Sequence, residues 1–180
     1  VEARLQVGLP AAGRKILGKQ ANIMLCKEIP QIVEQALLWK NLAQDQCLSF
    51  VECVENQEVV RRKLNESGLV AFVVNGALLP RESGISDRPL SGDQVVSFQA
   101  PTSLETQIEV PNQLHGGGTV VRGLGIPKGV TLIVGGGYHG KSTLLKALEK
   151  CVYAHIPDDG REYVVTTKDA VKIRAEDGRR

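Results

Sequence analysis

The sequence predicts the α/β fold class, with an α+β N-terminal domain followed by the start of a second domain. One observation is that β-branched runs typical of strands occur together with runs of helical spacing. A second is the composition of the 180 residues, 42% hydrophobic and 23% charged, which is the balance of a soluble globular protein. A third is a change in charge and glycine content near Pro111, which predicts a boundary between residues 1–111 and 112–180.

The two parts differ in charge. Residues 1–111 contain 11 Lys and Arg against 13 Asp and Glu, whereas residues 112–180 contain 11 against 7, together with 12 of the 19 glycines. A basic, glycine-rich part suits polyanions such as nucleotide phosphates or nucleic acid. A chance excess of surface lysines explains the difference in charge equally well. The positions of the glycines must therefore decide whether the second part binds polyanions.

Several classes of protein are excluded by simple features. The longest apolar runs have about six residues, as in Leu69–Val74, which predicts no membrane-spanning helix. The first residues carry Glu2 and Arg4 and lack the apolar core of a signal peptide. The start at Val1 and the end at Arg179–Arg180 in a charged stretch predict a piece of a longer protein.

The four cysteines form no C-x-x-C pair. Cys151 and His155 are four residues apart, but one such pair is far short of the four ligands of a structural zinc site. Free, mostly buried thiols in a reducing compartment are the default, so we expect an intracellular protein, in the cytoplasm or the mitochondrion.

The first half predicts two helices. Pro30 stands where a helix can begin, and an apolar face follows over residues 31–42. Residues 45–66 predict a second, polar-rich helix, and Gly68 is placed to end it. Three glutamates at spacings of three, and the basic run Arg61–Lys63, indicate exposed helix surface rather than a catalytic or phosphate site.

The rest of the first half predicts strands. Leu69–Val74 is a β-branched run, and Asn75–Gly76 predicts a type I′ hairpin that leads into Ala77–Leu79. Val95–Phe98 and Leu104–Val110 are further strand candidates.

A glycine-rich octet carries the clearest chemistry. Val130–Val134 predicts a strand buried on both faces, and it leads directly into Gly-Gly-Gly-Tyr-His-Gly-Lys-Ser over residues 135–142. Apolar residues then recur at helical spacing from about Lys141. The octet matches G-x-x-x-x-G-K-[ST], the phosphate-binding P-loop, and strand, loop and helix follow in the order that the motif needs.

The residue types fit phosphate binding. Glycines let the backbone turn tightly and bring its N–H groups close to phosphate oxygens, and the helix N-terminus adds free N–H donors and partial positive charge. Lys141 is expected to reach the β- and γ-phosphates, Ser142 to coordinate Mg²⁺, and Thr143 to meet the α-phosphate. The predicted phosphate-binding residues are Gly135, Gly136, Gly137, Tyr138, His139, Gly140, Lys141, Ser142 and Thr143, although Tyr138 and His139 fit exposed loop side chains equally well.

Longer stretches resemble one family. The pattern from Ile126 to Gly135, then Gly140-Lys141-Ser142-Thr143-Leu144-Leu145, resembles the opening of an ABC ATPase core. Residues 1–21, 69–90 and 123–178 are similar to the predicted ATPases of the ABC class, and GGGYHGKSTLL is the most specific part. The resemblance implies a longer parent that binds ATP and Mg²⁺ and hydrolyses ATP as a homodimer. One branch of the family is associated with mitochondrial RNA-binding and RNA-editing assemblies, which makes RNA a candidate partner.

The chain also departs from ordinary ABC ATPases. No aromatic residue lies between Phe98 and Tyr138, where an adenine-stacking ring is expected. No Gln follows Gln113, and neither an LSGGQ-like signature nor an apolar strand ending in Asp-Glu is present. Asp158–Asp159 lies between Pro157 and Gly160, which indicates a turn rather than a Walker B carboxylate. The catalytic base is therefore not identified, and these 180 residues alone are expected to hydrolyse little or no ATP.

Two other functions stay open at this stage. One is a nucleotide-regulated RNA-binding module without hydrolysis, although the strands lack the interleaved aromatics of single-strand binders. The other is a P-loop kinase for a small molecule, for which Arg161 and Arg174 are candidate lid arginines by residue type alone.

Overall fold

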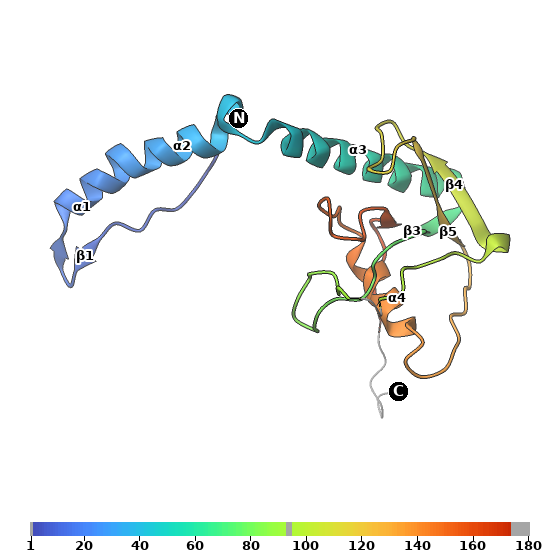
Figure 1. Cartoon of the computed structure of the whole chain (residues 1–180). Helices are drawn as coiled ribbons and strands as arrows, with labels where there is room; N and C mark the ends of the chain where they lie inside the picture. The colour runs from blue at the N-terminus through green and yellow to red at the C-terminus, as the bar shows by residue number, and fades with distance from the viewer. Residues whose placement is uncertain (1, 93–94, 174–180) are drawn as a thin grey trace. The chain divides into compact units, whose positions relative to one another are not determined.

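The computed structural model describes residues 2–92 and 95–173 and divides the chain into two compact units, Val1–Cys47 and Leu48–Arg180 (Figure 1). Helix α3 (Gln44–Glu66) begins just before the division and belongs almost wholly to the second unit. The glycine octet at residues 135–142 lies in the second unit, which therefore contains the candidate site.

The first unit is a small hairpin followed by helices. Strands β1 (Ala11–Ala12) and β2 (Lys15–Ile16) pair antiparallel around Gly13, whose φ is +59°. Next come α1 (Gly18–Ile23), a π-helical stretch (Met24–Glu28), α2 (Ile29–Leu37) and a 3₁₀ turn (Trp39–Asn41).

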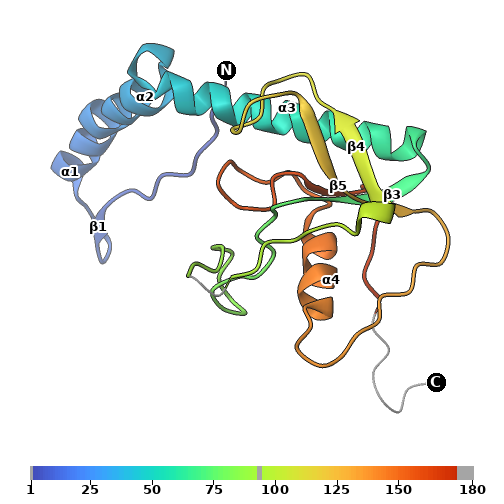
Figure 2. The same cartoon turned by 45° about the vertical axis from the view of Figure 1, so that its right-hand side comes forward.

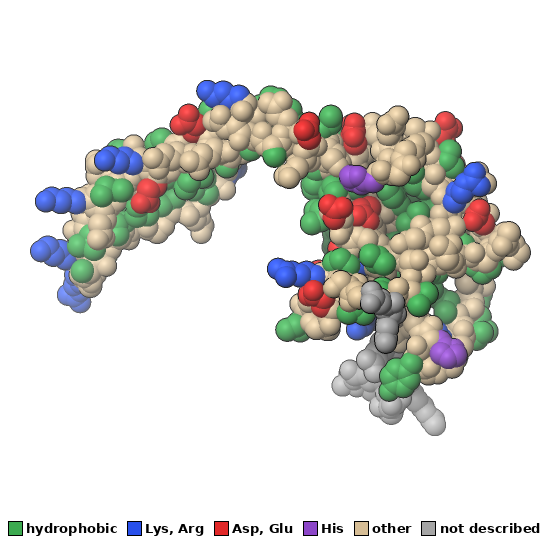
Figure 3. All heavy atoms as spheres, viewed as in Figure 1, with side chains coloured by type: hydrophobic (Ala, Val, Ile, Leu, Met, Phe, Trp, Pro, Cys, Tyr) green, Lys and Arg blue, Asp and Glu red, His purple; other side chains and the backbone are tan. Residues whose placement is uncertain are grey.

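Pro30 stands in the first turn of α2, as predicted. The helix expected up to residue 42 ends at Leu37, because Leu38 adopts an extended conformation (φ −92°, ψ 118°). None of these helices has a buried residue, and Figure 3 shows apolar side chains at the surface here among lysines and arginines.

The second unit is built on a four-stranded antiparallel sheet of order β4-β5-β3-β6. The strands are β3 (Leu69–Val74), β4 (Glu105–Glu109), β5 (Val120–Pro127) and β6 (Val164–Thr166). The strands predicted at residues 69–74 and 104–110 are confirmed. So is the helix at 45–66, which ends at Glu66 and is followed by Gly68, whose φ is +68°.

One helix packs on each face of this sheet (Figure 2). Helix α3 contributes Val60 and Leu64 to a buried cluster with Phe72 and Val165 of the sheet. Helix α4 (Lys141–Lys150) contributes Ala147 to a cluster on the other face, with Val73 and Val164. Burying both faces of the central strand explains why β3 is a continuous apolar run instead of an alternating one.

The hairpin predicted at Asn75–Gly76 is wrong. A turn does form, with the Ala77 N–H donating to the Val74 carbonyl at 3.3 Å, but of the two central residues only Gly76 has a positive φ. A type I′ turn needs positive φ at both, so the chain does not fold back on β3. The neighbours of β3 are instead β5 and β6, which come much later in the sequence.

Two further strand predictions are wrong. Residues 95–98 form no strand, although Phe98 exchanges two backbone hydrogen bonds with Gly76 and Ala77 at 2.8 and 2.9 Å. Residues 130–134, expected to be a buried strand, have no regular secondary structure and lie at the surface, and Val130 is fully exposed. In the described part of the chain the sheet ends at β4 and β6, so no strand lies beside this run to cover it.

The α/β class is confirmed, whereas the boundary near Pro111 stays a prediction. The pairing of β4 with β5 joins residues on either side of that position. Across residues 2–92 and 95–173, no helix combines the length and apolar character needed to cross a membrane.

Candidate nucleotide-binding site

The glycine octet forms an open loop that leads into α4, and its last two residues, Lys141 and Ser142, are the first two of that helix. Gly135 and Gly140 have φ values of +153° and +80°, and Tyr138 has φ of +61°. Gly140 is the N-cap of α4 in the left-handed conformation, and a Cβ at that φ would be strained. Gly135 and Gly140 therefore supply backbone conformations that the turn needs, and Tyr138 adopts one that L residues rarely take.

Lys141 folds back over this loop. Its Nζ donates to the carbonyl oxygen of Gly135 at 2.7 Å and to that of Gly136 at 2.5 Å. The ammonium group is thereby held on the loop's own backbone. The contact of Lys141 with the phosphates stays a prediction.

The start of α4 supplies backbone donors at the same place. The first described bond within the helix runs from the Leu144 N–H to the Gly140 carbonyl, at 2.9 Å. The N–H groups of Lys141, Ser142 and Thr143 precede it, in the turn where an α-helix has no internal acceptors. Ser142 is exposed and Thr143 half-buried.

Tyr138 and His139 differ in their relation to the loop. The Tyr138 side chain is fully exposed. His139 is also exposed, but its ring lies over the glycines, since a Cβ built on Gly136 would be 3.1 Å from its Cε1. His139 thus closes one side of the loop, and Gly136 leaves room for its ring.

A triphosphate fits these residues by their chemistry. The loop offers glycine backbone that a Cβ would crowd at Gly136, a lysine ammonium and a helix N-terminus, which are the donors of a phosphate site. The Ser142 hydroxyl is an oxygen ligand of the kind that Mg²⁺ takes beside substrate phosphates.

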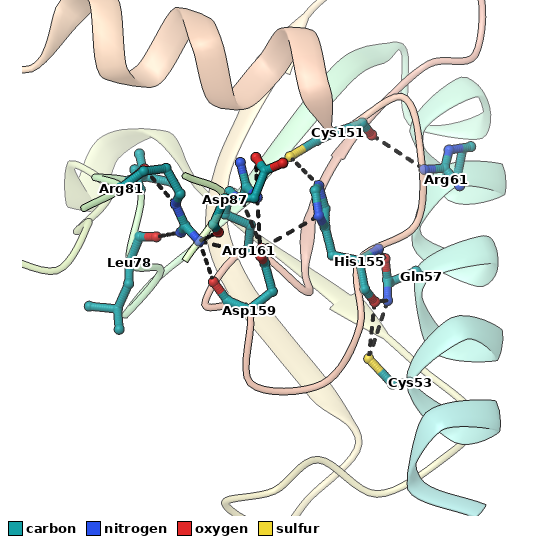
Figure 4. Close-up of polar contacts among 11 residues, drawn as sticks. Cys53, Gln57, Arg61, Leu78, Arg81, Asp87, Cys151, His155, Asp159 and Arg161 are labelled. Atoms are coloured by element: carbon teal, nitrogen blue, oxygen red, sulfur yellow. Dashed lines mark hydrogen bonds and ion pairs between the residues drawn. The ribbon is translucent and has the colours of Figure 1, made fainter. Parts of the chain in front are cut away.

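The carboxylate of the acidic turn is bound by two arginines. Asp159 is largely buried and accepts hydrogen bonds from Arg161 at 2.7 and 3.1 Å and from Arg81 at 3.3 Å (Figure 4). Burial acts to raise the pKa of the Asp159 carboxyl, but Arg161, then His155 and Arg81, outweigh it and hold the pKa below its usual range. The carboxylate is therefore committed to structure, in agreement with the interpretation of this segment as a turn.

Cys151 and His155 form a buried contact, with Sγ 3.2 Å from Nε2. Burial raises the pKa of the Cys151 thiol to about 12, and burial, with Arg161 next, lowers the pKa of His155. A neutral thiol donating to Nε2, with Nδ1–H directed at Asp159 3.4 Å away, satisfies all three groups. Within the part of the chain that the structure describes, no three His, Cys, Asp or Glu side chains come together as metal ligands.

Sequence reasoning missed much of this buried polar cluster. Arg61, predicted on exposed helix surface, is buried and donates to the carbonyls of Cys151 and Thr166 at 3.3 Å. Gln57 binds the backbone N–H and carbonyl of His155, both at 2.7 Å. In the sequence, the four-residue spacing of His155 and Asp159 was the only sign of this cluster. Hydrophobic periodicity does not reveal polar side chains that are buried because they form hydrogen bonds with the backbone.

The cysteines agree only in part with the prediction of mostly buried thiols. All four are free, and Cys53 and Cys151 are buried, but Cys26 is exposed and Cys47 half-buried. The candidate lid arginine Arg161 is buried against Asp159, and Arg174 lies outside the described residues.

Comparison with known proteins gives two family matches. A family model described as "ABC_ATPase: P-loop domain" matches residues 43–180, and one described as "ATPase of the ABC class N-terminal" matches residues 1–40. The uncharacterized protein MJ1628 of Methanocaldococcus jannaschii is 32% identical over 163 residues, which are 88% of this chain and 34% of that protein. The chain thus spans about a third of the length of this relative. With a P-loop at the start of α4 and a family match over most of its length, the chain belongs to the ATPases of the ABC class and contains their nucleotide-binding P-loop domain.

Proposed function

We propose that residues 135–143 bind the phosphates of Mg²⁺–ATP, and that this binding is the function of the second unit. The observation that carries the proposal is the position of Lys141, whose ammonium lies on the Gly135 and Gly136 carbonyls at the N-terminus of α4. A phosphate chain that enters the loop would replace these carbonyls as the partner of the Lys141 ammonium and would form charge-assisted hydrogen bonds with it. Mg²⁺ at Ser142 would neutralise part of the phosphate charge.

The proposal is tested by titrating the 180-residue chain with Mg²⁺–ATP in a calorimeter. Replacing Lys141 with Ala should weaken binding about 10- to 100-fold, the usual value of a charge-assisted hydrogen bond. Lys146→Ala is the matched control, because Lys146 is exposed on the same helix beyond the loop. Equal affinity of the Lys141→Ala variant and the unaltered chain would disprove phosphate binding at this loop.

We further propose that the parent protein hydrolyses ATP as a homodimer, with the rest of the catalytic site supplied by segments beyond these 180 residues. The support is that Asp159, of the acidic pair nearest in sequence, is bound by arginines, so no base is identified beside Lys141. Phosphoryl transfer to water needs a residue to position the water. A longer protein should therefore show ATP turnover that the 180-residue chain lacks, and Lys141→Ala should abolish it.

Coupling to RNA is a second proposal that rests on the family resemblance alone. Filter binding of single-stranded RNA at increasing salt checks it. Phosphate contacts require the affinity to fall as salt rises. Affinity that does not change with salt would exclude this mode of binding.

A further inference from the structure

An apolar cleft of about 470 Å³ opens beside the phosphate-binding loop. One wall comes from the segment after β3 and includes Leu79, Leu90, Val96 and Phe98. The opposite side includes Lys141 and Thr143, which belong to the proposed phosphate site. The cleft and the loop are therefore continuous, and the volume lies in the range of small-ligand sites.

Phe98 provides a fixed aromatic surface in this cleft. Its backbone N–H donates to the Ala77 carbonyl at 2.9 Å, and its carbonyl accepts from the Gly76 N–H at 2.8 Å. Its side chain packs against the buried cluster of Val73, Ala77 and Ala147 while still lining the cleft. A ring held from behind in this way loses little freedom when a flat group stacks on it.

Other apolar side chains of the cleft are left exposed. Val96 is 84% exposed and Val134 74%, and Leu90 is partly exposed. Contiguous apolar surface on a protein is typical of a binding site. Here the apolar surface meets a cationic edge at Lys141, so the cleft suits a ligand with one apolar and one anionic end.

A second cleft nearby can be compared with this one as a site for the apolar end of the ligand. It measures about 430 Å³ and shares Leu79, Pro80 and Thr143 with the first cleft. Its lining is largely charged, with five basic residues besides Asp87 and Glu149: Arg81, Lys146, Lys150, Arg161 and Lys172. The described lining of the apolar cleft includes no Asp or Glu. A charged lining does not suit an apolar group, so the cleft at Phe98 is the one that the apolar end of the ligand can occupy beside the loop.

We propose that the cleft lined by Phe98 holds the base of the nucleotide whose phosphates bind at residues 135–143. This inference rests on the proposed function. A nucleoside triphosphate joins a flat, largely apolar base to a polyanionic tail, and the site offers the matching surfaces in the same order. The aromatic residue that the sequence lacks just before the P-loop is thus supplied from much earlier in the chain, at Phe98.

The test compares Mg²⁺–ATP with Mg²⁺–tripolyphosphate, which has the phosphates but no base, by calorimetry on the 180-residue chain. Phe98→Ala should weaken ATP binding about tenfold, a usual value for losing one base–aromatic stack, and leave tripolyphosphate binding unchanged. Leu90→Ser, at a partly exposed position of the same wall, should act in the same direction without disturbing the core. Leu104→Ser is the matched control, since Leu104 is exposed and lies outside the cleft.

Each outcome decides between the two proposals. Variants that stay folded by circular dichroism and bind ATP as tightly as the unaltered chain would overturn the base site while leaving the phosphate site intact. The base site is also overturned if Phe98→Ala weakens the binding of ATP and of tripolyphosphate equally. It is likewise overturned if Leu90→Ser changes only the self-association of the chain, measured by sedimentation. If neither ligand binds the unaltered chain, or if Lys141→Ala affects neither ligand, the proposed function itself fails.

Discussion

Two arginines and a histidine surround the carboxylate of Asp159. Arg81 and Arg161 are both largely buried, and the Arg81 guanidinium also bonds the backbone carbonyls of Leu78, Asp87 and Asp159. The carboxylate therefore neutralises charge inside the protein and joins the segment after β3 to the turn before β6. Removing one partner of a buried ion pair leaves the others uncompensated, which costs more than the pair contributes.

Replacing Asp159 with Asn should therefore lower the free energy of unfolding by about 3–5 kcal/mol. The amide keeps the shape but leaves Arg81 and Arg161 without a counter-charge. Urea unfolding followed by circular dichroism measures the change. Asp169→Asn is the control, since Asp169 is exposed and its change should stay within about 0.5 kcal/mol. A loss as small as that of the control would show that the arginines find water or other acceptors.

The same cluster predicts that acid destabilises the fold in two steps. His155 has a pKa below its ordinary 6.5 in the folded chain, so below pH 6.5 the unfolded chain binds a proton that the folded chain does not. Stability then falls as pH falls, by up to about 1.4 kcal/mol per pH unit. Asp159, whose pKa is also lowered, keeps its contribution above its ordinary 3.8 and loses it as pH falls through its folded value.

Urea unfolding of the unaltered chain and of His155→Gln between pH 7 and 5 tests the first step. Glutamine does not titrate, so the slope of stability against pH should be shallower in the variant. His115→Gln, at an exposed histidine, should keep the slope of the unaltered chain. Identical slopes in all three would mean that His155 is not the group responsible.

At the scale of elements, the central pair of strands depends on one glycine. Gly123 of β5 pairs opposite Val74, and a Cβ there would overlap the Val73 carbonyl oxygen and lie 2.7 Å from the Val74 Cα. Both are backbone atoms of β3, the strand at the centre of both hydrophobic clusters. Any side chain at residue 123 must push the two strands apart.

Gly123→Ala should thus destabilise the second unit by about 1–3 kcal/mol, the usual cost of overpacking a core. Gly116→Ala is matched to it, because a Cβ at Gly116 meets no atom within 4 Å. Thermal unfolding by circular dichroism compares the two variants. Equal melting temperatures would show that β5 can shift away from β3 without loss.

Local sequence signals predicted the elements whose stability depends on residues close to them in the sequence. Helix α3, strand β3 and helix α4 follow from propensity, a C-terminal glycine and the P-loop motif. The failures involve distant partners: Asn75–Gly76 forms a turn, but β3 pairs with β5 and β6 from far along the chain. Residues 130–134 have strand composition, yet a strand also needs a neighbour, which the described residues do not provide. Phe98 was visible in the sequence, but its place beside the loop depends on that same tertiary pairing.

At the scale of the whole chain, the two units differ in what holds them together. The buried hydrophobic residues of the described chain run from Cys53 to Val165, and all of them belong to the second unit. In the first unit Leu37, Leu38 and Trp39 stay between 41% and 57% exposed. Burial of apolar surface is the main favourable contribution to folding, so the second unit should hold nearly all of the chain's stability.

A chain of residues 43–180, which keeps all of α3, should therefore fold and bind Mg²⁺–ATP as the 180-residue chain does. Its urea midpoint and slope should match those of the longer chain, because the slope follows the surface exposed on unfolding and residues 2–42 bury little.

Trp39, the single tryptophan, offers an internal check in the longer chain. Its emission should show no transition at the midpoint seen by circular dichroism, since its ring is already largely exposed. A lower midpoint in the shorter chain, or a Trp39 transition that coincides with unfolding of the core, would show that the first unit packs on the second and stabilises it.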